Sequence, residues 1–263
     1  MKNQINLKGQ VIMISGVTGQ LGQMITNEAL NSDAKVICID KSLEEMDKVA
    51  HICKWNKKNI LLQKADIREK KEIKSALDNG LSQFGKVTSQ INNSGVSVFD
   101  NWSERSEEDF DMVSDVNLKG TFFCMQVFMN HCIKSNTVGS IVNIASHYGL
   151  ISPDPRIYTD CLRRNSEVYG ATKAGIIQMT KYFSVNALAD GAKIRVNAVA
   201  PGGIKNPKNL QGKDFQKRYA DRCPMGRMAE TDEVVGPVLY LLSEDASYIN
   251  GHTLVVDGGM TAW

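Results

Sequence analysis

The feature that most constrains the fold of this chain is a regular alternation of short apolar runs with longer stretches of helical spacing. The runs predict strands at residues 11–15, 35–39, 59–63, 89–91, 140–144, 194–200 and 253–256. The stretches between them predict helices at residues 21–31, 43–54, 70–84, 107–131, 168–188 and 230–242. Several runs are continuously apolar, as in strands buried on both faces of a parallel sheet. The sequence therefore predicts a three-layer α/β fold, doubly wound around a mainly parallel, seven-stranded sheet.

Domain organisation follows from the uniformity of this pattern. No internal repeat, low-complexity segment or linker interrupts it, so we expect residues 1–263 to form a single dinucleotide-binding domain. Two segments, 151–167 and 201–214, lack periodicity and are predicted to be loops. Each follows the carboxyl end of a predicted strand, the edge at which open α/β sheets bind their ligands.

Composition excludes several classes of protein. The net charge is +2 and there is no basic stripe, which argues against a nucleic-acid partner. The first ten residues lack the apolar core of a signal peptide, and no apolar run approaches the ~18 residues of a membrane span. Six cysteines without a CxxC pair and four dispersed histidines indicate reduced thiols and no metal site. We therefore expect a cytoplasmic protein.

A glycine-rich turn follows the first predicted strand and opens the first helix. Its residues are Gly16, Thr18, Gly19, Gln20, Leu21 and Gly22. Glycine permits a tight turn and lets backbone N–H groups approach a diphosphate, and the helix N-terminus favours negative charge. The turn therefore predicts a dinucleotide site.

Carboxylates after the next two strands extend that site. Asp40 stands 24 residues beyond Gly16 and could accept hydrogen bonds from the adenosine ribose, although an exposed loop carboxylate is the alternative. Such a carboxylate repels a 2′-phosphate, so we expect NAD rather than NADP, with Lys41 next door softening the preference. Asp66, followed by Ile67, is a candidate for the adenine pocket or, equally, a helix N-cap.

A candidate catalytic set lies in the second half of the chain. Tyr169 and Lys173 are four residues apart, on one face of a predicted helix. A lysine cation favours the phenolate, so the pair could exchange a proton with a substrate oxygen. Ser146 ends a predicted strand and could bind a carbonyl oxygen, although a turn or cap role is the alternative. Asn117 lies inside a predicted helix, where it marks either an irregularity that holds a water beside Lys173 or an interruption at Gly120.

With these residues in this order, the chain resembles the short-chain dehydrogenase/reductase family along nearly its whole length. The shared motifs are the turn 16–22, Asp66, Asn92-Asn93-Ser94-Gly95, Asn117, Ser146, Tyr169 with Lys173, Pro201-Gly202 and the ending 253–259. The resemblance implies a catalytic tetrad of Asn117, Ser146, Tyr169 and Lys173, and hydride transfer at a nicotinamide. It implies further cofactor contacts from Asn93, Ser94, Gly95, Pro201, Gly202 and Ile204. It also implies a homotetramer or homodimer, usually joined through the helices 107–131 and 168–188.

Four positions depart from the family's pattern. Gln20 stands where the single-domain branch has its middle glycine, so the glycine spacing follows the extended branch. Ser94 replaces an alanine, and Asn206 stands near the position of a threonine that contacts the carboxamide. Ser146 and Tyr169 are 23 residues apart instead of about a dozen. We interpret the excess as an insertion in the substrate loop.

The predicted function is an NAD(H)-dependent interconversion of a secondary alcohol and a carbonyl, on a sugar or sugar derivative. The segment 146–158 resembles bacterial oxidoreductases of flagellin-modification and acidic-sugar pathways. Arg156, Arg163 and Arg164 are candidate ligands of an anionic or heavily hydroxylated substrate, or else partners in surface ion pairs. His147 and Tyr148 are candidate lining residues of the substrate pocket.

Two other functions compete with this prediction. A dinucleotide sensor or scaffold would retain the fold without turnover, but it would not need all four residues of the tetrad. A nucleotide-sugar epimerase or dehydratase would suit the glycine spacing. However, only about 60 residues follow Ala200, too few for the substrate domain that such enzymes add.

Overall fold

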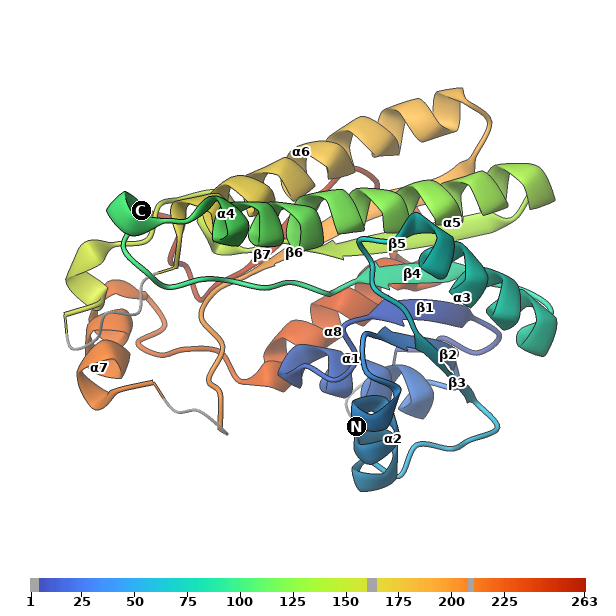
Figure 1. Ribbon diagram of the computed structural model, residues 1–263, viewed down its shortest axis with the longest axis horizontal. Coiled ribbons are helices and arrows are strands. Elements are labelled where there is room, and N and C mark those ends of the chain that lie inside the picture. Colours follow the sequence, from blue (N-terminus) through green and yellow to red (C-terminus); the bar gives the residue numbers. More distant parts are fainter. Residues whose placement is uncertain (1–4, 160–164, 208–210) are drawn as a thin grey trace.

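A single sheet organises the chain in the computed structural model, which describes residues 5–159, 165–207 and 211–263 (Figure 1). Its parallel strands are β1 (Val11–Ser15), β2 (Lys35–Asp40), β3 (Ile60–Lys64), β4 (Ser89–Asn92), β5 (Val138–Ile144), β6 (Lys193–Pro201) and β7 (Thr253–Val256). They lie in the order β3-β2-β1-β4-β5-β6-β7. The order reverses between β1 and β4, so the ligand crevice is expected at the carboxyl ends of these strands.

Helices cover both faces of the sheet, as Figure 1 shows. The helices are α1 (Gln20–Asn31), α2 (Leu43–Ile52), α3 (Lys70–Phe84), α4 (Glu107–Ser114), α5 (Thr121–Ser135), α6 (Glu167–Ala189), α7 (Lys213–Arg222) and α8 (Thr231–Leu242). One apolar cluster joins the sheet to α1, α2 and α8, and a second joins it to α3, α5 and α6. The predicted doubly wound, three-layer architecture is therefore confirmed.

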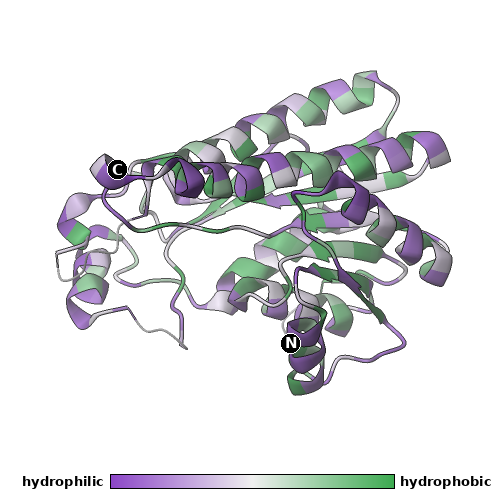
Figure 2. Cartoon of the chain, viewed as in Figure 1, coloured by the Kyte–Doolittle hydropathy of each residue, from purple (hydrophilic) through white to green (hydrophobic). Residues whose placement is uncertain are grey.

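The core explains why the strand predictions were accurate. Every residue of β1 is buried, and hydrophobic residues concentrate on the strands and on the inward faces of the helices (Figure 2). A strand buried on both faces needs an unbroken apolar run, which is the pattern read from the sequence. All seven predicted strands are present, with ends that differ by one or two residues.

The long helix predicted at residues 107–131 is wrong in its continuity. The chain forms α4, then a π-helical segment at Asp115–Gly120, and then α5. Asn117 lies in the π-helical segment, so the irregularity suspected at this residue is real. Such wider turns occur most often at functional sites, where they redirect a side chain.

Helix α7 was missed by the sequence analysis. The predicted loop 201–214 ends inside it, and most of its side chains are polar, so it lacks a strong apolar stripe. Its buried residues, Phe215 and Tyr219, are one turn apart and pack against Tyr158 from the predicted loop 151–167. The described part of that loop, which contains a short helical turn at Pro155–Ile157, contacts α7.

A backbone contact joins the turn after β5 to helix α6. The short helical turn His147–Gly149 lies against α6, where a Cβ on Gly149 would come 2.8 Å from the carbonyl carbon of Lys173 and 2.9 Å from the nitrogen of Ala174. Both obstructing atoms belong to a helix backbone and cannot rotate away. Glycine is therefore required at this contact.

We expect Gly149→Ala to lower the free energy of unfolding by about 2 kcal/mol, because the turn must move away from α6. Urea denaturation followed by circular dichroism measures the change. The matched control is Gly236→Ala inside α8, where a Cβ would meet nothing within 4 Å. That variant should be unchanged or more stable by roughly 0.5–1 kcal/mol. An unchanged midpoint for Gly149→Ala would contradict the contact.

Candidate active site

Two clefts lie at the carboxyl edge of the sheet, and the first follows the glycine-rich turn. This glycine-turn cleft, of about 400 Å³, is lined by predicted cofactor residues: Gly16, Thr18, Gly19, Gln20, Leu21, Gly22, Asp40, Lys41, Ile67, Asn93, Ser94 and Gly95. Residues from the ends of β1, β2, β3 and β4 and from helix α1 are thus brought together. Ala65, Val96 and Val116 complete the lining, and the sequence analysis did not single them out.

The turn itself is tightly packed. Gly16 has a φ of +72°, and a Cβ on Gly22 would lie 2.1 Å from the carbonyl oxygen of Gly16. The side chain of Asn93 donates hydrogen bonds to the carbonyl oxygens of Ser15 and Gly16, at 3.1 and 3.0 Å. The turn is thereby anchored to the end of β4. Its backbone is left without side chains where a dinucleotide's diphosphate would approach, so the residues present fit that group.

Asp40 is positioned within the cleft by the glycine-rich turn. Its Oδ2 accepts hydrogen bonds from the backbone nitrogen of Thr18 at 3.0 Å and from its hydroxyl at 2.7 Å. Its Oδ1 accepts one from the nitrogen of Lys41 at 2.8 Å. The carboxylate is therefore held at the end of β2 rather than free on a loop.

Asp66 pairs with charged neighbours, and its role in an adenine pocket stays a prediction. It does not line the glycine-turn cleft, and its carboxylate forms a fork with the guanidinium of Arg68, the shortest N···O distance being 2.6 Å. These bonds lower the pKa of Asp66 to about 2. The N-cap of α3 is Glu69, so the cap interpretation is wrong. The neighbouring Ile67 faces the cleft instead.

Gln20, which replaces the family's middle glycine, links distant segments. Its Nε2 donates hydrogen bonds to the carbonyl oxygen of Lys205 at 2.5 Å and to the hydroxyl of Thr231 at 2.6 Å. Lys205 follows β6, and Thr231 begins α8. The side chain therefore connects the glycine-rich turn to the segment that leads into the second cleft.

Three residues of the predicted tetrad meet between β5 and α6. Ser146 and Tyr169 line the same cleft, and the hydroxyl of Ser146 acts to lower the pKa of the phenol. The ammonium group of Lys173 lies 5.6 Å from the centre of the Tyr169 ring and donates a hydrogen bond of 2.7 Å to the carbonyl oxygen of Ile144. The helical spacing of four residues thus places the phenol and the ammonium group on the same side of α6, as predicted.

Asn117 approaches the same place from the π-helical segment. Its amide oxygen accepts a hydrogen bond from the nitrogen of Val96, and its amide nitrogen donates one to the carbonyl oxygen of Val96 and one to the hydroxyl of Thr172. A Cβ on Gly95 would lie 3.4 Å from the Asn117 oxygen and 3.5 Å from the Lys173 nitrogen. The amide of Asn117 and the ammonium group of Lys173 therefore both lie next to Gly95.

Burial dominates the electrostatics of this set. It lowers the pKa of Lys173 from 10.5 to about 8, because a charged ammonium is poorly solvated there. Burial also raises the pKa of Tyr169, and the hydroxyl of Ser146 opposes that rise. The net change is opposite to the lowering expected from Lys173, whose ammonium group donates its hydrogen bond to the Ile144 carbonyl.

The second cleft, which we call the aromatic cleft, begins at Ser146 and Tyr169. Its volume is about 460 Å³. It is lined by the rings of Phe99, Tyr148, Tyr158, Phe215 and Tyr219 together with Ser146, His147, Asn165, Tyr169, Gly202, Gly203, Ile204, Gln211, Gly212 and Met228. Of these, the sequence analysis predicted His147 and Tyr148 to line a substrate pocket. The sequence analysis did not single out Phe99, Phe215, Tyr219 and Gln211. The spacing of Phe215 and Tyr219, which suits one face of a helix, was the only pattern that could have indicated any of them.

The end of β6 forms one rim of the aromatic cleft. Gly202 and Ile204 line it, whereas Pro201 contributes its carbonyl oxygen, to which Nδ1 of His147 donates a hydrogen bond of 2.9 Å. Asn206 is not among the residues that line either cleft.

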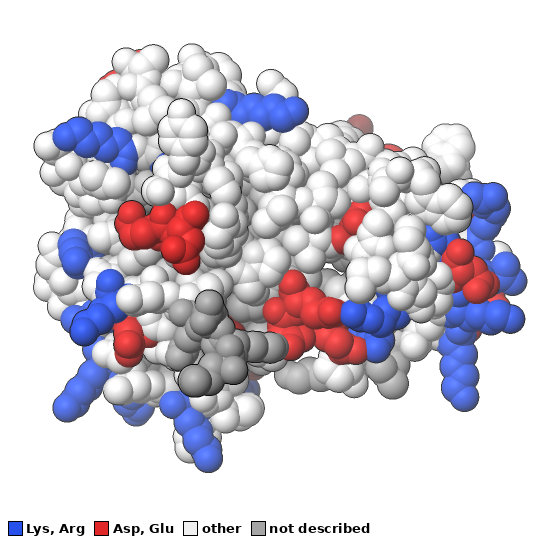
Figure 3. Space-filling view, turned by 180° about the vertical axis from the view of Figure 1, so that it is seen from behind, with Lys and Arg blue, Asp and Glu red and all other residues white. Residues whose placement is uncertain are grey.

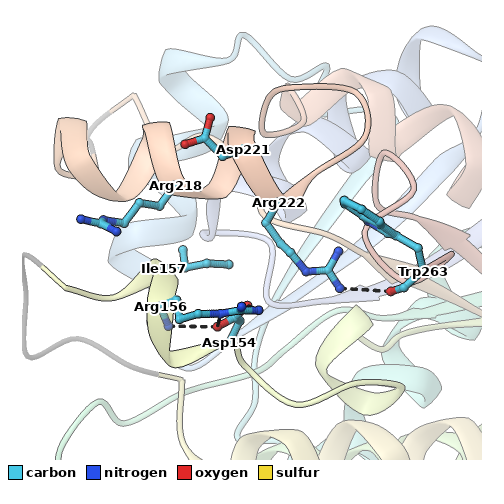
Figure 4. A pocket seen from close by; sticks show the side chains of 7 residues that line it. All are labelled: Asp154, Arg156, Ile157, Arg218, Asp221, Arg222 and Trp263. Atoms are coloured by element: carbon cyan, nitrogen blue, oxygen red, sulfur yellow. Dashed lines mark hydrogen bonds and ion pairs between the residues drawn. The ribbon is translucent and has the colours of Figure 1, made fainter.

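Of the arginines predicted to bind substrate, the structure describes only Arg156, which does not line the aromatic cleft. Arg156 is 81% exposed and pairs with Asp154 in a separate cleft that also contains Arg218, Arg222 and Trp263 (Figure 4). The alternative prediction for Arg156, a partner in a surface ion pair, agrees with this geometry. Arg163 and Arg164 lie outside the described residues.

Acidic and basic side chains are intermingled on the face shown in Figure 3, with uncharged surface between them. Among the described residues, no helix is both long enough and apolar enough to cross a bilayer.

Comparison with known proteins identifies the family. Residues 16–261 match the family model described as enoyl-(acyl carrier protein) reductase. The chain belongs to the short-chain dehydrogenase/reductase family, and it is an oxidoreductase of that family. It is 32% identical to the 3-oxoacyl-[acyl-carrier-protein] reductase FabG of Thermotoga maritima, over 97% of this chain and 99% of that protein.

Solved structures of the family agree with the fold and bind both forms of the cofactor. A short-chain dehydrogenase from Leptospira borgpetersenii with bound NAD+ has a TM-score of 0.87 and 34% identity, covering 97% of this chain and 94% of that one. ElxO with NADP bound has a TM-score of 0.84 and 28% identity, covering 97% of this chain and 99% of that one. These neighbours leave NAD(P) as the cofactor class.

The link through Gln20 generates a prediction for this family member. Gln20→Leu should lower the free energy of unfolding by about 1–2 kcal/mol and weaken NADH binding, because two hydrogen bonds across the cofactor site are lost. Thr231→Val removes one acceptor, so the double variant should be less destabilised than the sum of the single variants.

Urea denaturation and NADH fluorescence titration measure both effects. Gln23→Leu, in the next turn of α1, is the comparison: its amide bonds only to the carbonyl oxygen of Thr18, within the turn itself. If the loss of stability in the double variant equals the sum of the losses in Gln20→Leu and Thr231→Val, the hydrogen bond between these two side chains is contradicted.

Proposed function

We propose that this protein interconverts a secondary alcohol and a carbonyl compound by hydride transfer with NAD(H), using Tyr169 as the general acid and base. The observation that carries the proposal is that the hydroxyls of Ser146 and Tyr169 line one end of the aromatic cleft, with the ammonium group of Lys173 5.6 Å from the centre of the Tyr169 ring. The proposal places the reaction in one domain, which the family model spans over residues 16–261.

Each residue of the tetrad has a proposed role that follows from its contacts. The hydroxyl of Ser146 orients the substrate oxygen, and the phenol of Tyr169 gives a proton to that oxygen or accepts one from it. Lys173 keeps a positive charge beside the phenol and so favours its ionised form. Asn117 holds the π-helical segment against the strand end at Val96. Bound NAD(P) supplies the hydride acceptor or donor.

The cofactor preference is proposed to be NAD over NADP. The carboxylate of Asp40 is fixed at the cleft by the turn, and it could accept hydrogen bonds from a free ribose diol. A 2′-phosphate at the same place would meet that negative charge. Lys41 lies beside it, but its ammonium group is 3.6 Å from Asp66, which offsets its charge.

We also propose that copies of the chain associate through α5 and α6, which run side by side (Figure 1). The supporting observation is the exposed apolar residues Tyr182, Val185 and Leu188 on α6, with exposed fractions of 55%, 66% and 45%.

Tyr169→Phe should reduce kcat by roughly 100-fold or more, because it removes the proton that the reaction exchanges with the substrate oxygen. NADH affinity should change little, since the glycine-turn cleft is unaltered. Steady-state kinetics with the best alcohol substrate and NADH fluorescence titration measure the two effects. A kcat close to that of the wild type would disprove the assigned role of Tyr169.

Asp40→Ala should lower kcat/KM for NAD and raise it for NADP, because it removes both the ribose acceptor and the repulsion of the phosphate. The ratio of the two values should move toward NADP by about 10-fold or more, the worth of one charged hydrogen bond. Lys41→Ala serves as the matched neighbour and should move the ratio toward NAD. Wild-type protein that uses NADP as well as NAD would overturn the preference.

A further inference from the structure

We propose that the aromatic cleft binds a neutral ring compound that carries at least one hydroxyl group besides the one that reacts. This inference rests on the proposed function and names the substrate class for the same site. Three features of the described lining carry it: a wall of aromatic carbon, the lack of ionised side chains and two acceptors without partners.

The wall of the cleft presents ring faces rather than hydroxyl groups. The hydroxyls of Tyr148 and Tyr158 hydrogen-bond each other, and that of Tyr219 accepts a hydrogen bond of 2.7 Å from the nitrogen of Gly203. Tyr158 and Phe215 are 5.3 Å apart between ring centres, and Phe215 and Tyr219 are 6.1 Å apart. These rings therefore form a continuous packed surface, which suits the apolar face of a ring-shaped ligand.

The described lining carries no ionised side chain to meet a charged substrate. None of its described residues is Asp, Glu, Lys or Arg. Arg156 lies in a separate cleft with Asp154, and Lys205, near the rim, pairs with Glu230. A carboxylate or phosphate transferred from water into this cleft would lose its hydration without gaining a cation from the described lining.

Two buried acceptors in the same lining have no hydrogen-bond partner. The Nδ1–H of His147 donates to the Pro201 carbonyl, and burial lowers the pKa of this imidazole, so its Nε2 is an unprotonated acceptor. The Nε2 of Gln211 donates to the carbonyl oxygen of Ile204, which leaves the amide oxygen as an acceptor. Both atoms are buried, and neither has a partner in the structure.

Unpartnered acceptors specify what the ligand must bring. A buried acceptor without a partner destabilises the unliganded cleft, and a hydroxyl donor on the ligand removes that penalty. A carboxylate, which only accepts hydrogen bonds, would repel both atoms. The aromatic wall and the two acceptors therefore select an apolar ring face with hydroxyl donors at its edge, such as a cyclic diol or a neutral sugar ring.

A matched set of three probes tests this inference: cyclohexanol, a vicinal cyclohexanediol and a hydroxycyclohexane carboxylate. NADH formation from NAD is measured for each. We expect kcat/KM for the diol to exceed that for cyclohexanol by roughly 3- to 10-fold, the worth of one hydrogen bond. The carboxylate should be at least about 100-fold poorer than the diol, because its charge stays uncompensated.

Two variants locate the effect. Gln211→Leu should lower the ratio of kcat/KM for the diol to that for cyclohexanol by roughly 3- to 10-fold, to a value close to one, because only the added hydroxyl loses a partner. Arg156→Ala, in the separate cleft, should change none of the three values. If Gln211→Leu still prefers the diol to cyclohexanol, the amide oxygen of Gln211 does not bind the second hydroxyl, and this part of the proposal is overturned.

Failure of the substrate class differs from failure of the proposed function. If the carboxylate is turned over better than the diol, the proposal of a neutral substrate is overturned. If Arg163→Ala or Arg164→Ala then abolishes the preference for the carboxylate, that preference is assigned to the replaced arginine. If NADH binds but no probe or its ketone reacts, the proposed function fails. Calorimetric binding of the same three probes to the NADH complex then decides the class: tighter binding of the carboxylate, or no binding of the diol, overturns it.

Discussion

The hydrogen bond from the buried ammonium group of Lys173 to the carbonyl oxygen of Ile144 is the interaction on which the site depends. It joins α6 to the last residue of β5 at 2.7 Å. Ser146 lies two residues beyond that carbonyl, and Tyr169 lies one helical turn before the lysine. One bond between a strand end and a helix therefore sets the relation of the two hydroxyl groups. The backbone contact at Gly149 holds the same two elements together on the other side of Ser146.

This anchoring has an electrostatic cost that bears on the chemistry. A buried ammonium has a lowered pKa, about 8 here, so the charge that would favour the phenolate of Tyr169 is itself easily lost. The same burial raises the pKa of the phenol. The two pKa values are therefore moved apart, and each change favours the uncharged form of its group. The desolvation cost of burying both groups therefore falls at the place where proton transfer is proposed.

In the proposed function, ligand binding has two parts: the glycine-turn cleft binds the cofactor, and the aromatic cleft binds the substrate. The glycine-turn cleft is built from strand ends and backbone, with Asp40 as its distinguishing charge. The aromatic cleft combines residues that follow β5 and β6 with side chains from the insertion before α6 and from α7, which pack on each other through Tyr158 and Phe215. Substrate choice can therefore vary with these surface segments while the sheet and the cofactor turn remain the same. Gln20 connects the two parts through Lys205.

The sequence by itself determined the sheet, the glycine turn and the helical pair Tyr169 and Lys173, because each depends on local periodicity or spacing. An unbroken apolar run such as 11–15 can hardly be anything but a buried strand, and residues four apart on a helix must share a face. It could not determine helix α7, whose stability comes from packing Phe215 and Tyr219 on a distant loop. Nor could it decide between the alternatives for Asp66 and Arg156, because neighbouring charges, Arg68 and Asp154, capture these side chains. Only the tertiary structure decides which way such a side chain points, since partners and burial are properties of the folded chain.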